Sequence, residues 1–224
     1  MLDVGRIEAI LFDLDGTLMQ LQGGQKGGTL AHWLRPLAWA LPDCDPEAAA
    51  RRLFVVTETP TNYLLALLDR TGLMSLLQPL ADRARVAKGI GILGSLHPVE
   101  GVSELLPRLA TIYPLGVLTN RARREAYGFL DANDLRQYFD AVTTRQDIWR
   151  FKPHPEAVRR TARFLNVLPE RVLMVGDLPV DMETAKRAGA QALGVLTGFA
   201  TEVELRAAGA DEVVQSVTEM ERLL

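Results

Sequence analysis

The sequence has 224 residues, of which 48% are hydrophobic and 24% are charged, and its formal net charge is -3. This length suits one substantial domain, or a core domain that carries a smaller inserted one. The composition argues against a disordered chain, and the slight acidic surplus does not favour nucleic acid as a partner.

Cysteine content and hydropathy also bear on where the protein works. The single cysteine, Cys44, excludes an intrachain disulfide and fits a reducing compartment. The first six residues contain an early acid and lack the apolar core of a secretory signal. No apolar run approaches the roughly 20 residues that a membrane helix needs. We therefore expect a cytoplasmic protein without membrane contact, either a monomer or a homodimer, whose partner is a small molecule.

Short apolar runs that end in polar residues recur along the chain. Each is typical of a buried strand that leads into a loop. The first covers residues 9–13, and the last, a short run at 211–214, is suited to an edge strand. The expected strands between them cover residues 114–118, 139–144, 171–175 and 192–196, of which 139–144 has the weakest pattern.

Segments with apolar residues at helical spacing separate these strands. The expected helices cover residues 102–110, 123–133, 155–165 and 181–188. The last of them ends at Gly189, a residue type that favours helix C-termini. Strands that alternate with helices predict parallel β-α-β units, and therefore an α/β protein with a doubly wound, Rossmann-like sheet.

Residues 19–96 interrupt this alternation. Helical patterns follow one another there without a convincing strand, and Asp45-Pro46-Glu47 has the residue types of a helix start. We therefore expect an all-helical cap domain at residues 19–96, inserted into a core domain formed by residues 1–18 and 97–224.

Four polar clusters follow predicted strands, although they lie far apart in the sequence. In an open parallel sheet, ligands bind at the carboxyl ends of the strands, so we expect the clusters to meet in one crevice. The clusters are Asp13-Leu14-Asp15-Gly16-Thr17, Thr119-Asn120, Lys152 within Phe151-Lys152-Pro153-His154-Pro155, and Gly176-Asp177 with Asp181.

The first cluster carries two carboxylates on one side of an extended segment, because Asp13 and Asp15 are two residues apart. They would repel each other unless a cation lay between them. One carboxylate can attack phosphorus and form an aspartyl-phosphate. The other can protonate the leaving oxygen and then activate water. Gly16 permits the sharp turn that brings the backbone near a ligand.

The other clusters offer hydrogen-bond donors and further oxygen ligands. Thr119 and Asn120 can donate to phosphoryl oxygens, although a helix N-cap is an equally open interpretation of this pair. Lys152 can offset charge on a phosphoryl group and keep a nearby aspartate ionised. Asp177 and Asp181 complete an oxygen-rich site that suits Mg²⁺.

These motifs, in this order, resemble those of the haloacid dehalogenase-like hydrolase superfamily, within it the phosphoglycolate phosphatase-like branch with a helical cap. The resemblance covers nearly the whole core and implies the fold, the chemistry and the cofactor Mg²⁺. It implies Asp13 as the nucleophile, Asp15 as general acid and base, and Thr119 and Lys152 as phosphoryl binders.

The resemblance also implies the metal ligands and the remaining substrate contacts. Mg²⁺ would be held by the Asp13 carboxylate, the Asp15 backbone carbonyl and Asp177, while Asp181 supports the metal or Lys152. Substrate binding would further involve Gly16, Thr17, Asn120 and Arg121.

Two positions depart from the pattern of many relatives. Leu178 stands where they carry Ser or Thr, which removes one hydroxyl from the surroundings of the metal. Arg121 stands where they carry Lys, so a phosphate or substrate contact and a surface charge are both open for it.

The sequence therefore predicts a Mg²⁺-dependent phosphatase for a small phosphorylated metabolite, similar to phosphoglycolate phosphatase. An alternative is a phosphomutase of the β-phosphoglucomutase type, which would keep the aspartyl-phosphate long enough to pass it on. A dehalogenase is disfavoured because those relatives lack an acid at the position of Asp15. A binding protein on the same fold is also less favoured, because all core positions are filled.

Overall fold

The computed structural model describes residues 1–20, 35–36, 46, 49 and 96–224. The chain divides into two compact units, one formed by residues 1–20 and 97–224 and the other by residues 21–96. Nearly all of the cap expected at residues 19–96, with its helical patterns, lies outside the described residues.

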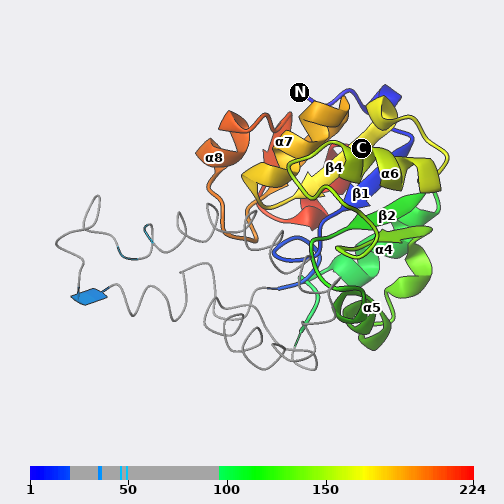
Figure 1. Ribbon diagram of the computed structural model, residues 1–224, viewed down its shortest axis with the longest axis horizontal. Helices are drawn as coiled ribbons and strands as arrows, with labels where there is room; N and C mark the ends of the chain where they lie inside the picture. The colour runs from blue at the N-terminus through cyan, green and yellow to red at the C-terminus, as the bar shows by residue number, and fades with distance from the viewer. Residues whose placement is uncertain (21–34, 37–45, 47–48, 50–95) are drawn as a thin grey trace. The chain divides into compact units, whose positions relative to one another are not determined.

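A six-stranded sheet forms the centre of the first unit, in the order β3-β2-β1-β4-β5-β6 (Figure 1). Every neighbouring pair is parallel, so the α/β fold that the sequence predicts is confirmed. The strands are β1 (Ala9–Phe12), β2 (Leu115–Leu118), β3 (Ala141–Thr143), β4 (Val172–Gly176), β5 (Gln191–Val195) and β6 (Glu212–Val214).

Strand β1 lies in the middle of the sheet because it is apolar on both faces. All four of its side chains are buried, and Phe12 pairs in register with Val117 of β2 and Val175 of β4. The Phe12 ring also meets Phe139 edge to face, with ring centroids 6.3 Å apart. A strand of this kind is stable only where neighbours cover both of its edges and both of its faces.

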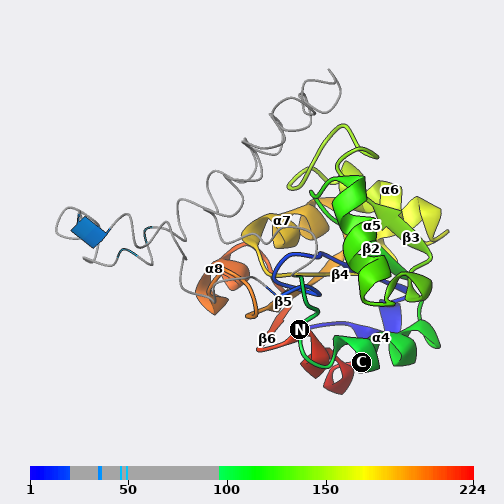
Figure 2. The same cartoon turned by 90° about the horizontal axis from the view of Figure 1, so that it is seen from below.

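Helices cover both faces of the sheet, with α6 and α7 on one face and α4 on the other (Figure 2). The expected C-terminus at Gly189 is confirmed, since this residue caps α7 with a positive φ of 87°. Helix α7 begins at Pro179, two residues before the predicted start. The α-helices are α4 (Val102–Ala110), α5 (Arg123–Ala132), α6 (Glu156–Phe164), α7 (Pro179–Ala188) and α8 (Glu202–Ala207).

Short 3₁₀ helices complete the connections between these elements. They are η1 (Val4–Arg6), η4 (Arg136–Tyr138), η5 (Pro169–Arg171) and η6 (Val217–Arg222). Among the described residues, no helix combines the length and the apolar character that crossing a membrane requires.

The segment by which the chain leaves the first unit is hydrogen-bonded to the segment by which it returns. The Gln20 N–H donates to the His97 carbonyl over 2.9 Å, and the Val99 N–H donates to the Leu18 carbonyl over 2.9 Å. Met19 and Pro98 form an antiparallel bridge between these segments. Because the two ends are adjacent, a long insertion after β1 leaves the central sheet intact.

Chain order reverses direction at β1, which has β2 on one side and β4 on the other. Such a switch point opens a crevice at the carboxyl ends of the strands, where open α/β sheets bind their ligands. The loops that follow β1, β2 and β4 therefore converge on one place and carry three of the polar clusters, while Lys152 lies on the loop that follows β3.

Candidate active site

The loop after β1 is a tight turn closed by its own backbone. The N–H groups of Thr17, Leu18 and Met19 all donate to the Leu14 carbonyl, and the Gly16 N–H donates to the Met19 carbonyl. Gly16 has a φ of 74°, and a Cβ on it would lie 2.5 Å from Asp177 Oδ2. Glycine is therefore required at this position both for its backbone conformation and for the close approach of Asp177.

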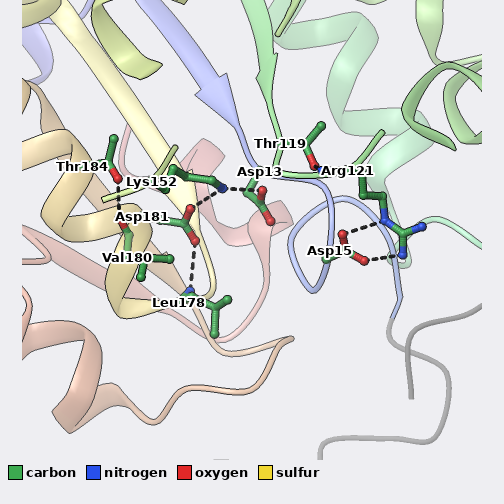
Figure 3. A network of polar contacts seen from close by, with 9 residues as sticks. All are labelled: Asp13, Asp15, Thr119, Arg121, Lys152, Leu178, Val180, Asp181 and Thr184. Carbon is green, nitrogen blue, oxygen red and sulfur yellow. Dashed lines mark hydrogen bonds and ion pairs between the residues drawn. The ribbon is translucent and has the colours of Figure 1, made fainter. Parts of the chain in front are cut away.

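Asp13, Lys152 and Asp181 form a buried cluster of charges (Figure 3). Lys152 Nζ lies 2.6 Å from Asp13 Oδ1 and 2.6 Å from Asp181 Oδ1. The lysine comes from the loop between β3 and α6, and Asp181 from the first turn of α7, where its Oδ2 accepts the Leu178 N–H over 3.1 Å. The sheet topology thus brings together three residues that sequence analysis had placed in separate clusters.

The two carboxylates of this cluster outnumber its one lysine, so a further positive charge would stabilise their ionised forms. Burial raises the pKa of Asp13 to about 8, although Lys152 acts in the opposite direction. Burial acts to lower the pKa of Lys152, but Asp13 and Asp181 outweigh it and raise that pKa above its ordinary value. Lys152 is therefore a cation at neutral pH, whereas a divalent cation beside Asp13 would favour its carboxylate form.

Asp15 points to a different partner from Asp13. Arg121 binds its carboxylate with two parallel hydrogen bonds, from Nε to Oδ2 over 2.7 Å and from Nη2 to Oδ1 over 2.6 Å (Figure 3). Although burial acts to lower it, Asp15 and Glu125 raise the pKa of Arg121. Arg121 is buried, so the interpretation of it as a surface charge is wrong.

Thr119 follows β2 and is buried beside the same loop. Its Oγ1 accepts the N–H of Arg121 over 3.1 Å. The N-cap of the next helix, α5, is Ala122, and no side chain caps it. The interpretation of Thr119 and Asn120 as helix caps is therefore wrong. Asn120 is half-buried in the loop between β2 and α5.

Asp177 follows β4 and is held by a loop that sequence analysis did not assign to the site. Its Oδ2 accepts the Phe199 N–H over 3.1 Å, and a Cβ on Gly198 would lie 1.7 Å from the same oxygen. The Thr197 hydroxyl donates to the Gly16 carbonyl over 2.5 Å. The sequence could have indicated this loop, because Thr197 and Gly198 directly follow the strand predicted at residues 192–196, as the other clusters follow theirs.

Gly16 and Thr17 contribute the shape of the loop, since their N–H groups donate within it. The Thr17 side chain is buried, and its Oγ1 has no hydrogen-bond partner among the described residues. Neither residue offers a backbone donor to a ligand in this arrangement.

Three carboxylates could hold a metal ion together. Asp13, Asp177 and Asp181 are buried and each offers one carboxylate oxygen, with these atoms within 4.8 Å of one another. Hard oxygen ligands of this kind, with room for waters, are what Mg²⁺ prefers. The donor set therefore fits Mg²⁺, while the Asp15 side chain is engaged by Arg121.

A sequence profile described as "Haloacid dehalogenase-like hydrolase" matches residues 84–195, half of the chain. The structure of a hydrolase from Pseudomonas syringae superposes with a TM-score of 0.69 and 24% identity, over 96% of each chain. This likeness concerns the fold.

Two relatives carry phosphatase names. A phosphoglycolate phosphatase from Nitrosococcus oceani is 31% identical over 129 residues, which cover 57% of this chain and 57% of that protein. Pyrophosphatase PpaX from Bacillus mycoides is 32% identical over 108 residues, which cover 48% of this chain and 50% of that protein. The chain thus spans about half the length of the relatives it matches.

Proposed function

Because this chain belongs to the haloacid dehalogenase-like hydrolase family, we propose that it is a Mg²⁺-dependent phosphatase acting on a small phosphorylated metabolite. The observation that carries the proposal is the buried Asp13–Lys152–Asp181 cluster at the carboxyl end of the central strand. Buried charges are costly unless they are paired, and they concentrate at sites that do chemistry.

The first step transfers the phosphoryl group to the protein. An oxygen of Asp13 forms a bond to phosphorus while the bond to the leaving oxygen breaks. Protonated Asp15 gives its proton to that oxygen, which leaves as an alcohol. Among the described residues, Asp13 and Asp181 occupy two of the three N–H donors of Lys152, which leaves one for a phosphoryl oxygen.

The second step releases inorganic phosphate. Asp15, now a carboxylate, accepts a proton from water as the water oxygen attacks phosphorus. The bond between phosphorus and the Asp13 oxygen breaks, which restores the Asp13 carboxylate. Thr119 and Asn120 serve as donors to the phosphoryl oxygens in both steps.

The metal would be held by Asp13, Asp177 and Asp181, with the Asp15 backbone carbonyl as a further ligand. Bound Mg²⁺ supplies positive charge that offsets the phosphoryl oxygens and the carboxylates around them. Asp181 also orients Lys152, so it serves the metal and the lysine together.

The relatives' names support a substrate of the phosphoglycolate type, and the pyrophosphatase name supports inorganic pyrophosphate as a second compound to test. We propose that the core, residues 1–18 and 97–224, carries the chemistry. The inserted residues 19–96 then serve as a cap that selects the substrate.

The test is phosphate release with Mg²⁺ from p-nitrophenyl phosphate, phosphoglycolate, pyrophosphate and a broad set of phosphorylated metabolites. We expect release by the wild type and none by Asp13→Asn. Asp211→Asn is the matched control, because Asp211 pairs with Lys186 beside the amino end of β6. Folded protein without Asp13-dependent release from any compound contradicts the proposal. An isomerised product without released phosphate indicates the phosphomutase alternative.

A further inference from the structure

Arg121 lies in the loop between β2 and α5 and is buried, whereas arginine side chains are mostly exposed. Only 6% of its side chain is exposed, and its guanidinium meets both oxygens of Asp15. This planar fork matches a carboxylate in two hydrogen bonds, which gives directional restraint that a lysine cannot reproduce.

The main chain of Arg121 is fixed on both sides. Its N–H donates to Thr119 Oγ1 over 3.1 Å, and its carbonyl accepts the Arg145 N–H over 3.0 Å. A third contact joins Nη1 to Glu125 Oε2, 3.8 Å away and one turn along α5. The guanidinium is thus held between two acids on a backbone that has little freedom.

Asp15, in contrast, has little else among the described residues to fix its side chain. It lies on the loop after β1 with 29% of the side chain exposed, so packing alone does not select one rotamer. The direction of the Asp15 carboxylate therefore depends on the arginine.

We propose that Arg121 is a positioning residue that aims Asp15 at the leaving oxygen and at the attacking water, and is not a ligand of the substrate phosphate. The inference rests on the proposed function, in which Asp15 is the general acid and base. Nε, Nη1 and Nη2 of Arg121 all face protein carboxylates, while Lys152 supplies the cation beside Asp13. The arginine acts on the reaction through Asp15.

A double-mutant cycle tests this role. Arg121→Gln and Arg121→Lys are measured in the wild-type and the Asp15→Asn backgrounds, and Arg123→Gln, on the exposed surface of α5, is the control. In the wild-type background we expect kcat to fall about 10- to 100-fold for Arg121→Gln, with KM and inhibition by inorganic phosphate nearly unchanged. In the Asp15→Asn background the comparison is made on the slow residual release of phosphate, and the further loss is expected to be less than about threefold.

A second measurement keeps the test independent of general damage to the fold. We expect kcat/KM of Arg121→Lys and Arg121→Gln to fall more for an alkyl phosphate than for 2,4-dinitrophenyl phosphate. The leaving group of the latter needs no proton. Arg121→Lys keeps the buried cation, so it serves if Arg121→Gln does not fold.

Two outcomes would overturn the inference. One is an equal loss in both backgrounds with weakened binding of inorganic phosphate, which would make Arg121 a substrate ligand. The other is an unchanged kcat in both Arg121 variants. Failure of the proposed function has a different signature, because the wild type would then show no turnover that depends on Asp13.

Discussion

The two ends of the parallel sheet differ in whether their paired charged side chains are buried or exposed. At the carboxyl end, Asp13 and Asp181 are buried and each pairs with buried Lys152. At the amino end, Glu8 just before β1 pairs with Arg171 just before β4, and these side chains are 46% and 51% exposed. Acidic and basic side chains thus form a buried cluster at one end and an exposed surface pair at the other.

We interpret this difference as one between charges on the surface and charges in the proposed active site. An exposed pair contributes about 0–1 kcal/mol. A buried cluster must overcome several kcal/mol of desolvation for each ion, and removing one partner exposes that cost. Among the described residues, this buried cluster lies at the carboxyl end of the sheet, where we propose that the reaction takes place. Substitutions at the two ends should therefore have very different effects.

The largest effect on stability is expected for Lys152→Met. The change leaves the carboxylates of Asp13 and Asp181 buried without their cation, so we expect a loss of about 3–5 kcal/mol in the free energy of unfolding without Mg²⁺. Urea denaturation measures it. Lys186→Met removes a half-exposed lysine that pairs with Asp211 and is the matched control, with an expected loss of less than about 1 kcal/mol. Equal losses in the two variants would remove the distinction between the ends.

Mg²⁺ should stabilise the carboxyl end specifically. At a concentration of about 100 times its Kd, an ion that binds only the native state raises the free energy of unfolding by about 2.7 kcal/mol. We expect this shift in thermal or urea denaturation of the wild type and of Asp211→Asn, and its loss in Asp177→Asn. A shift of the same size in Asp177→Asn would place the metal elsewhere.

Gly198→Ala should disturb the loop that holds Asp177. The new Cβ would lie 1.7 Å from Asp177 Oδ2, so either the Asp177–Phe199 hydrogen bond or the loop must give way. We expect a loss of about 1–3 kcal/mol together with weaker Mg²⁺ binding, measured by denaturation at several Mg²⁺ concentrations. Gly5→Ala is the control, because its nearest neighbour would be Asp3 Oδ1 at 3.7 Å. Unchanged stability and Mg²⁺ binding in Gly198→Ala would show that the loop does not position Asp177.

The smallest effect is expected at the amino end. Arg171→Gln breaks the surface pair with Glu8 and should cost less than about 1 kcal/mol, with turnover unchanged. High salt should reduce even this difference, because exposed charges are screened. A loss of several kcal/mol that persists in high salt would contradict the contrast between the two ends.

The strands and the charged cluster at their carboxyl ends could be predicted from the sequence. Apolar runs ending in polar residues identified all six strands of the sheet, and the rule that parallel strands present ligands at their carboxyl ends brought Asp13, Lys152, Asp177 and Asp181 together. Helix α8 was missed although Thr201 and Glu204 form a capping box, because its six residues carry too short an apolar pattern.

The pairing of Arg121 with Asp15 could not be predicted in the same way. The two residues are 106 positions apart, and their contact depends on side-chain rotamers that no sequence period encodes. The approach of Gly198 to Asp177 likewise depends on how closely two strand-end loops pack. That the core carries the chemistry and the cap selects the substrate remains a prediction, since nearly all of residues 19–96 lie outside the described residues.

Phosphorylation of Asp13 can be tested directly by one measurement. The Asp15→Asn variant is mixed with 2,4-dinitrophenyl phosphate and Mg²⁺, quenched in acid, digested with pepsin at low pH and analysed by mass spectrometry. This substrate needs no proton on its leaving oxygen, whereas release of phosphate from the protein needs the base that the variant lacks. We expect one phosphoryl group on Asp13, and none when Asp13→Asn is combined with Asp15→Asn. A phosphoryl group on another residue, or turnover by the wild type with no covalent phosphoryl group in either protein, would contradict the account.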